Sequence, residues 1–413
     1  MHLANIGCQR PAPPSWSAPL IECGPGMPRG DRRFRIPTKL YKCGLPQRTL
    51  GVRLGRGFDA GHGMPFDQQA CRNQPGWIFV VHWRFENSQH GDANLNSHAA
   101  PQLPIAAFDL VYRCEGEPDL PHYPGSAWRG AFGHALKRTV FVVRDQRCTE
   151  CMPYRTCVYP YVFETPPPPS AEKMRRYPAA PHPFVPHIDP RRQSGDYHLG
   201  LILFGRAERQ LPYFIRALEQ AGQHGIGRRR QLFALTEVRQ AMLPAATAWQ
   251  TIYADDQPLR AEPAIIMAAP EPPARVEVRL EAPLRLQRDS RLVTPAMFRF
   301  GDLFGTLLRR LSMLTYFHAD TPLETDFAAL TETARAVSID SEELYWYDWT
   351  RYSSRQDTTM DMGGLLGRFE LDGAVLAPFW PYLWLGQWTH AGKGTSMGLG
   401  RYALHATSLS EQA

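Results

Sequence analysis

The sequences PIAAFDLVYRC, residues 104–114, and AWRGAFGHALKRTVF, residues 127–141, together decide the fold. The first is apolar and β-branched enough to predict a buried strand. The second follows a loop, and its helix begins at Gly125 or Ser126, residue types that suit a helix start. Its apolar residues recur near one helical face: Ala127, Ala131, Leu136 and Val140. The chain therefore predicts a strand followed by an amphipathic helix.

Three further segments extend this unit in chain order. YHLGLILFG (197–205) predicts a strand, LPYFIRALEQAG (211–222) predicts a helix that ends at a glycine, and QLFALTEVRQ (231–240) predicts another strand. A Cys-rich insertion at about 144–190 separates the two rounds. The order of strand, helix, insertion, strand, helix and strand indicates a βαββαβ, ferredoxin-like domain over residues 101–240.

A second round of the same elements follows over residues 275–413, after a linker rich in Ala and Pro at 241–274. Its predicted elements are a strand at 275–287, helices at 295–317 and within 325–337, a hairpin of 343–355 with 363–373, and an edge strand at 400–408. We therefore expect an α+β protein of tandem ferredoxin-like, or RNA-recognition-like, βαββαβ domains with the Cys-rich insertion in the first.

The first hundred residues differ from the rest. They are rich in Pro, Gly, Arg, Asn and Gln and show no sustained apolar period, so we expect residues 1–100 to be a disordered N-terminal extension. Such a segment would either lie upstream of the true start of the protein or act as a basic arm that binds nucleic acid.

The net charge of +6 lies in that extension. Residues 1–100 hold 12 of the 46 Lys and Arg and 6 of the 40 Asp and Glu, which leaves 34 of each sign in residues 101–413. Only local patches can therefore indicate nucleic-acid binding. No apolar run approaches the roughly 18 residues of a membrane span, and no signal segment opens the chain. We expect a cytoplasmic protein without a membrane partner.

Three cysteines in the insertion have the spacing of metal ligands. Cys148, Cys151 and Cys157 lie two and five residues apart, and thiolates two residues apart can hold one tetrahedral Zn²⁺. Cys114, a nearby histidine or a water could complete the set. The sequence predicts a structural zinc, and the competing interpretation is free thiols or a knuckle without metal.

A glycine-rich segment near the C-terminus, THAGKGTSMGLGRY at 389–402, predicts an anion site. It holds the glycines Gly392, Gly394, Gly398 and Gly400. Glycines let the backbone approach a phosphate closely, and successive amides can converge on it. Lys393 and Arg401 add positive charge, and His390 precedes the loop. A plain tight turn is the competing explanation.

A second local basic patch is GIGRRR at 225–230, which contains Arg228, Arg229 and Arg230. A basic turn of this kind can contact a phosphate backbone. It can equally be a solvated turn.

The ending HAGKGTSMGLGRY resembles the C-terminal glycine-rich motif of CRISPR-associated endoribonucleases of the repeat-associated mysterious protein (RAMP) superfamily, which process precursor guide RNA. The resemblance covers residues 104–406, and four upstream segments agree in order with a zinc-cysteine subgroup: PGSAWRGAFGHALKR, CTECMPYRTCVYPYVFETP, HGIGRRRQLFALTEV and WTRYSSRQDTTMDMGGLLG. One departure is that a fourth cysteine near the first helix is absent.

The resemblance implies cleavage of CRISPR repeat RNA into guide RNA without a catalytic cofactor. The 2′-hydroxyl would attack the adjacent phosphate and leave a 2′,3′-cyclic phosphate and a 5′-hydroxyl. Such chemistry needs a base, an acid and positive charge for the phosphorane.

Several side chains are candidates for these roles. His134 and His390 are the candidate bases, with His122 and Tyr123 as the remaining ones. Arg351, Arg355 and Lys393 are candidates for stabilising the phosphate, and the arginines could instead be solvated strand charges.

Two other functions stay open on the sequence. One is a catalytically inactive RAMP-type subunit that binds guide RNA inside a CRISPR effector complex. The other is a zinc-containing enzyme that acts on a small phosphorylated ligand.

Limited proteolysis tests the predicted domain limits. A protease should remove the first hundred residues early, because disordered chain reaches a protease active site without unfolding, while residues 101–413 resist. Mass spectrometry of the fragments over time identifies the cleavage sites. Equally fast cleavage in both parts of the chain would contradict the prediction.

Overall fold

The computed structural model describes residues 100–140, 148–171, 173, 179–188, 196–244, 248–254, 257–353 and 358–407, together with 40–41 and 78–79. The chain divides into two compact units, Met1–Asp92 and Ala93–Ala413. In the first unit, the described part is β1 (Leu40–Tyr41) paired antiparallel with β2 (Ile78–Phe79). The predicted disorder of residues 1–100 otherwise falls outside the described residues.

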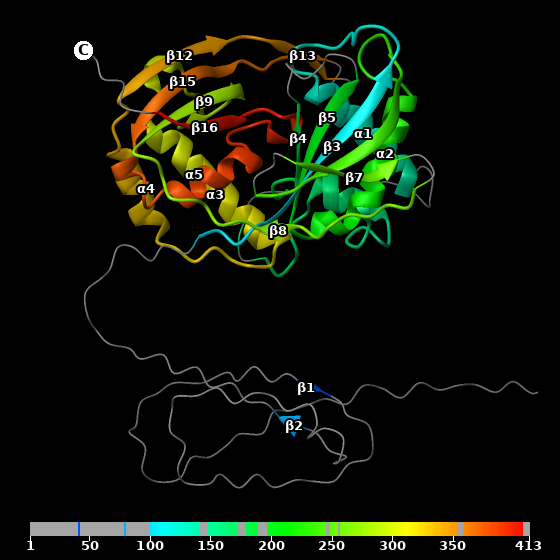
Figure 1. Ribbon diagram of the computed structural model, residues 1–413, viewed down its shortest axis with the longest axis horizontal. Helices are drawn as coiled ribbons and strands as arrows, with labels where there is room; N and C mark the ends of the chain where they lie inside the picture. Colours follow the sequence, from blue (N-terminus) through cyan, green and yellow to red (C-terminus); the bar gives the residue numbers. More distant parts are fainter. Residues whose placement is uncertain are drawn as a thin grey trace, which may run out of the picture. The chain divides into compact units, whose positions relative to one another are not determined.

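The second unit begins with a complete βαββαβ domain, here called the first half (Figure 1). Its elements are β3 (Pro104–Cys114), α1 (Gly125–Val140), β4 (Phe184–His187), β5 (Tyr197–Phe204), α2 (Leu211–Gln223) and β6 (Phe233–Ala241). The strands pair antiparallel in the order β4-β5-β3-β6. This is the ferredoxin-like order, and it confirms the predicted fold class. The elements predicted from the sequence in this half are found within about two residues of their expected bounds.

Strand β4 was not predicted, because Pro183 and Pro186 made its segment resemble an extended connection. Within the described part of the chain, β4 pairs with β5 alone and forms one edge of the sheet. An edge strand tolerates proline, since a missing N–H on the outer side costs no ladder hydrogen bond.

The segment predicted as a linker, residues 241–274, also contributes strands. β7 (Trp249–Ala254) extends the first sheet beyond β6, and β8 (Ile265–Ile266) pairs with the start of β3. The polypeptide between the halves is therefore held along the first sheet by backbone pairing.

The second half repeats the same topology. Its main elements are β9 (Arg275–Leu284), α3 (Phe300–His318), α4 (Phe327–Arg335), β12 (Ser341–Tyr347), β15 (Gly364–Asp372), α5 (Trp380–Thr389) and β16 (Tyr402–Ala406). The antiparallel order is β12-β15-β9-β16, with β16 at one edge as predicted. Two small hairpins are added: β10 (Gln287–Arg288) with β11 (Arg291–Leu292), and β13 (Thr350–Ser353) with β14 (Thr358–Asp361). The helix α5 was not predicted, because its segment is apolar on every side and shows no helical period.

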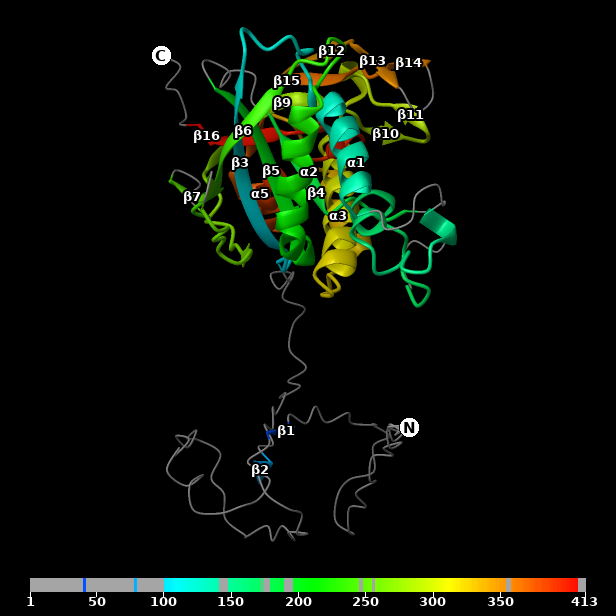
Figure 2. The same ribbon diagram turned by 90° about the vertical axis from the view of Figure 1, so that its right-hand side faces the viewer.

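The first sheet is buried on both faces. Along β3, Ala106, Phe108, Leu110 and Tyr112 join the core beneath α1 and α2, which cover that face side by side (Figure 2). Ile105 and Ala107 point the opposite way, into a core shared with the second half. This explains why the β3 sequence is an apolar run without alternation. Of the helices that the structure describes, none is long and apolar enough to cross a membrane.

The shared core predicts the effect of truncating Phe304. This α3 side chain is fully buried and contacts the rings of Phe300, Phe379 and Tyr382. We expect Phe304→Ala to lower the free energy of unfolding by about 3–5 kcal/mol, because it leaves a cavity in a packed core. Denaturant unfolding followed by tryptophan fluorescence measures the loss.

The control is Val375→Ala at a side chain that is 45% exposed, where we expect a change within about 0.5 kcal/mol. Equal stability of the two variants would show that Phe304 does not anchor this core.

Candidate active site

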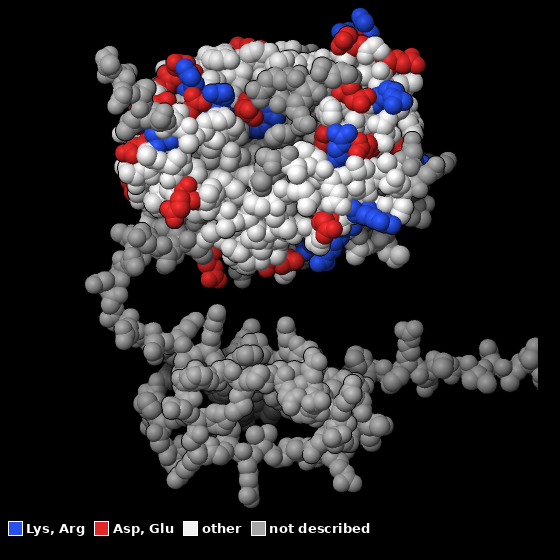
Figure 3. Space-filling view, viewed as in Figure 1, with Lys and Arg blue, Asp and Glu red and all other residues white. Residues whose placement is uncertain are grey.

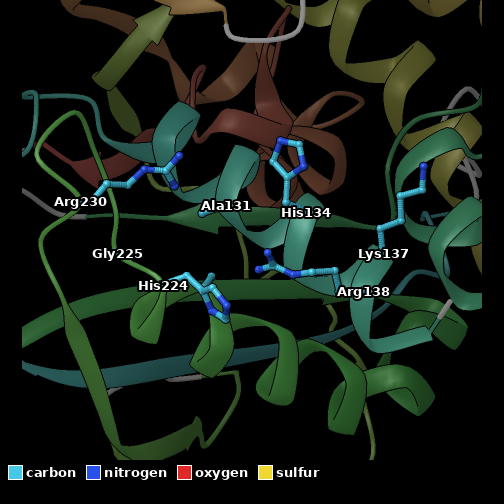
Figure 4. A pocket seen from close by; sticks show the side chains of 8 residues that line it. Ala131, His134, Lys137, Arg138, His224, Gly225 and Arg230 are labelled. Carbon is cyan, nitrogen blue, oxygen red and sulfur yellow. The ribbon is translucent and has the colours of Figure 1, made fainter. Parts of the chain in front are cut away.

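A basic cavity lies between the exposed sides of α1 and α2 (Figure 4). Its volume is about 410 Å³, and its walls are Ala131, His134, Lys137, Arg138, Ala221, His224, Gly225 and Arg230. Two imidazoles, a lysine and two arginines thus line one cavity. The described wall residues include no carboxylate.

Helix α1 supplies three of these groups because of its period. His134, Lys137 and Arg138 are spaced at i, i+3 and i+4, so they lie on one helical face. The opposite face buries Phe132 and Leu136 in the core. His134 is therefore exposed, as a predicted base must be.

A hydrogen bond fixes α1 against α2 next to the cavity. The Thr139 hydroxyl lies 3.0 Å from the side-chain oxygen of Gln220 on α2 and 3.0 Å from the carbonyl of Ala135 on its own helix. The walls that α1 and α2 contribute are thereby held at a set separation.

The predicted basic turn closes the third side. Ile226 and Gln231 pair as an antiparallel bridge, and the Gln231 side chain accepts from the backbone amide of Asp119 at 2.7 Å. Gly225 has φ of +85°, and a Cβ there would overlap the carbonyl of Arg230. The turn is therefore rigidly attached to the loop before α1, and it carries Arg230 to the cavity wall.

The two other arginines of the turn, Arg228 and Arg229, are exposed. Arg229 forms an ion pair with Asp119 at 3.2 Å. All three predicted arginines of this patch therefore lie at the surface.

The cavity differs in charge from the face of the molecule that Figure 3 shows. The face seen in Figure 3 is largely uncharged and mixes basic with acidic side chains where its charges are visible. A site lined by one sign of charge attracts the opposite sign, so the α1–α2 cavity fits a phosphate group.

The glycine-rich loop has the conformation of a closed turn. Each of its predicted glycines has positive φ, between +72° and +83°. The amides that donate to backbone carbonyls are those of Ala391, Lys393, Met397, Gly398, Leu399 and Gly400. These amides are not available to a phosphate in this structure, so the glycines are required here by backbone geometry.

The loop joins the two halves. A Cβ on Gly125, at the start of α1, would overlap the carbonyl of Met397, and Gly398 lies against Pro186 of β4. Arg129 of α1 contacts the Ser396 hydroxyl at 3.0 Å. The loop therefore seals the junction between the first and second halves.

His390 and Arg401 are buried within this junction, with exposed fractions of 0% and 3%. His390 Nδ1 lies 3.3 Å from the carbonyl of Leu399. Burial, and then the neighbouring His187, holds the pKa of His390 well below its ordinary value. Arg401 contacts Glu281 at 3.0 Å and His187 at 3.1 Å. In this structure neither side chain is placed to touch RNA at the surface.

The remaining predicted residues are spread around the junction. Lys393 and His122 are exposed. Tyr123 packs its ring against Tyr347 and Trp349, and burial raises its pKa to about 12. Arg351 reaches the Ser126 hydroxyl at 3.3 Å. Arg355 lies outside the described residues.

Cys114, Cys148, Cys151 and Cys157 are partly buried free thiols. Among the described residues, no group of three or more His, Cys, Asp or Glu side chains is placed to hold an ion. Burial and the nearby Glu164 raise the pKa of Cys148, whereas the carboxylates near Cys114 are Glu117 and Asp196. The two thiols therefore have different surroundings, and the structural zinc stays a prediction.

Sequence reasoning missed Lys137, Arg138 and His224 as site residues. The spacing from His134 is a signal that could have found the first two. His224 lies ninety residues further along, and no local pattern links it to α1.

Two family models match consecutive parts of the chain. One is described as the AF_1859 N-terminal domain and matches residues 103–264. The other, described as the CRISPR-associated endoribonuclease Cas6, matches residues 278–402. The gap between the matches, residues 265–277, contains β8 and the first residues of β9, where the two halves meet.

Solved structures of Cas6 proteins resemble the chain distantly. A Cas6 product complex is 17% identical, with 73% of this chain and 99% of that chain covered, at a TM-score of 0.45. Thermus thermophilus Cas6 is 15% identical, with coverages of 73% and 99% and a TM-score of 0.42. A partial Cas6-RT-Cas1–Cas2 complex is 15% identical, with coverages of 77% and 48% and a TM-score of 0.40. No curated protein matches the sequence.

The closed turn predicts the effect of a methyl group at Gly400. Its φ is +72°, and a Cβ would overlap the carbonyl of Ala391. We expect Gly400→Ala to destabilise the protein by at least about 1–2 kcal/mol, because a side chain in the left-handed region costs that much even without the overlap. Thermal unfolding measures the change.

The control is Gly130→Ala on the exposed part of α1, where a Cβ meets nothing within 4 Å. There we expect about 0.5–1 kcal/mol of stabilisation, because alanine favours the helix. Stabilisation by both substitutions would contradict the geometry of the loop.

Proposed function

We propose that this chain is a CRISPR-associated endoribonuclease of the Cas6 type, because residues 278–402 match the model of that family, and that it cuts repeat RNA in the α1–α2 cavity without a metal ion. The observation that carries the proposal is the placement of His134 in a cavity with Lys137, Arg138 and Arg230 (Figure 4). A base and cations in one space are what phosphate cleavage by a neighbouring hydroxyl requires.

His134 acts as the base in this proposal. A neutral imidazole accepts the proton of the 2′-hydroxyl, and the resulting alkoxide attacks the adjacent phosphorus. The bond to the 5′-oxygen then breaks, which leaves a 2′,3′-cyclic phosphate and a 5′-hydroxyl. The phosphorane carries more negative charge than the starting diester, so the cations on the cavity wall stabilise it more than the ground state.

Exposed cations outside the cavity extend the RNA path. Arg228 and Arg229 lie on the turn that carries Arg230, and Lys393 lies on the glycine-rich loop. Contacts of this kind hold the phosphate backbone without reading sequence. The partners we propose are repeat RNA and the guide RNA product. Association with CRISPR effector subunits and structural zinc in the insertion stay predictions.

Cleavage assays with repeat RNA in excess EDTA test the proposal. We expect a cut that ends in a cyclic phosphate, and no cut when the nucleotide before the scissile phosphate is deoxy, because the nucleophile is then absent. His134→Ala should slow cleavage by about 10²–10⁴-fold, since that is the usual contribution of a general base. RNA affinity should stay within a few-fold.

The matched control is His405→Ala, an exposed histidine of β16 that is not part of the cavity wall. It should cleave at the parent rate. Tight RNA binding without any cleavage by the parent protein would favour the catalytically inactive RNA-binding subunit. Full activity of His134→Ala would refute the assignment of the base.

A further inference from the structure

Cleavage by a neighbouring hydroxyl needs a proton donor as well as a base. The 5′-oxygen leaves as a poor alkoxide unless a proton reaches it as the bond breaks. His134 accounts for the base alone. The donor must lie in the same cavity, on the far side of the phosphate from the base.

His224 is held with one nitrogen directed away from its helix. It is exposed and follows the last residue of α2, where its Nδ1 lies 2.7 Å from the carbonyl oxygen of Gln220. A carbonyl only accepts, so Nδ1 carries a proton and donates it. Nε2 is then the nitrogen that can exchange a proton with a substrate.

The position of His224 relative to His134 is set by the packing of the two helices. Gln220 accepts from His224 through its backbone, and its side chain contacts Thr139 of α1. The same residue therefore links α1 to α2 and orients the imidazole. Figure 4 shows His134 and His224 on separate walls of the cavity, with Arg138 between them.

His224 lies beside the last carbonyl groups of α2. The last carbonyl groups of a helix carry partial negative charge, which favours a cation at that end. The cations of the cavity, Lys137, Arg138 and Arg230, lie on α1 and on the turn after α2. A phosphate bound among them would screen their repulsion of an imidazolium.

We propose that His224 is the general acid of this site, an inference that rests on the proposed function. His134 takes the proton of the 2′-hydroxyl as the 2′-oxygen–phosphorus bond forms. His224 Nε2 gives its proton to the 5′-oxygen as the phosphorus–5′-oxygen bond breaks. One proton is taken and one is given, so charge balances, and exchange with water restores both imidazoles.

A substrate with sulfur in place of the leaving 5′-oxygen tests this role. A thiolate leaves without being protonated, so a missing acid no longer slows the reaction. We expect His224→Ala to cleave normal repeat RNA about 10²–10⁴-fold more slowly than the parent and the sulfur-containing RNA within a few-fold of it. His134→Ala should be slow on both RNAs, because the base is needed in each case.

The companion variant His224→Gln keeps a polar side chain and removes the titrating group. It should match His224→Ala on both substrates, and RNA affinity and thermal stability of both should stay near those of the parent. Equal losses on the two RNAs, or no loss on either, would overturn the role of His224. If only the alanine variant of Lys137 or of Arg138 cleaved the sulfur-containing RNA at the parent rate but normal RNA slowly, that residue would be the proton donor in place of His224. Failure of the parent to cut either RNA would instead refute the proposed function.

Discussion

The burial of the first sheet on both faces is the constraint on which the rest of the structure depends. One face receives α1 and α2, and the other face places Ile105, Val185, Ile202 and Phe204 in a core with α3 and α5 of the second half. A sheet with two apolar faces cannot be stable in water alone, since each uncovered face would lose its burial free energy. The two halves therefore form one compact unit with a shared core.

In this arrangement the glycine-rich loop and the basic cavity lie on different surfaces of the protein. The glycine-rich loop lies where the halves meet and packs closely against α1 and β4. A side chain at Gly125 would overlap the Met397 carbonyl of the loop, and Gly398 of the loop lies against the backbone of Pro186. The helices α1 and α2 lie on the outer face of the first sheet, where their charged sides stay accessible. Assembly of the halves and the proposed binding of phosphate thus involve different surfaces of the same domain.

Hydrogen bonds between neighbouring elements hold the walls of the cavity in place. Thr139 and Gln220 join the helices, and Gln231 attaches the basic turn to the loop before α1. Side chains held in this way lose little further freedom when a phosphate binds, which favours precise placement of a scissile bond. His134 is exposed in this cavity, whereas His390 is fully buried, and burial favours the neutral form of its ring.

The sequence by itself determined the elements whose apolar pattern is local. β3, α1, α2 and the order of the tandem domains follow from runs and periods within about 20 residues, and the sequence also singled out His134 on α1. Strand β4 was not predicted because its segment contains prolines, and helix α5 was not predicted because its segment is apolar throughout and shows no helical period. Only the tertiary structure decided that His390 and Arg401 are buried at the junction, and that His224 faces the same cavity as His134. These placements depend on contacts between segments far apart in the chain, which residue spacing does not encode.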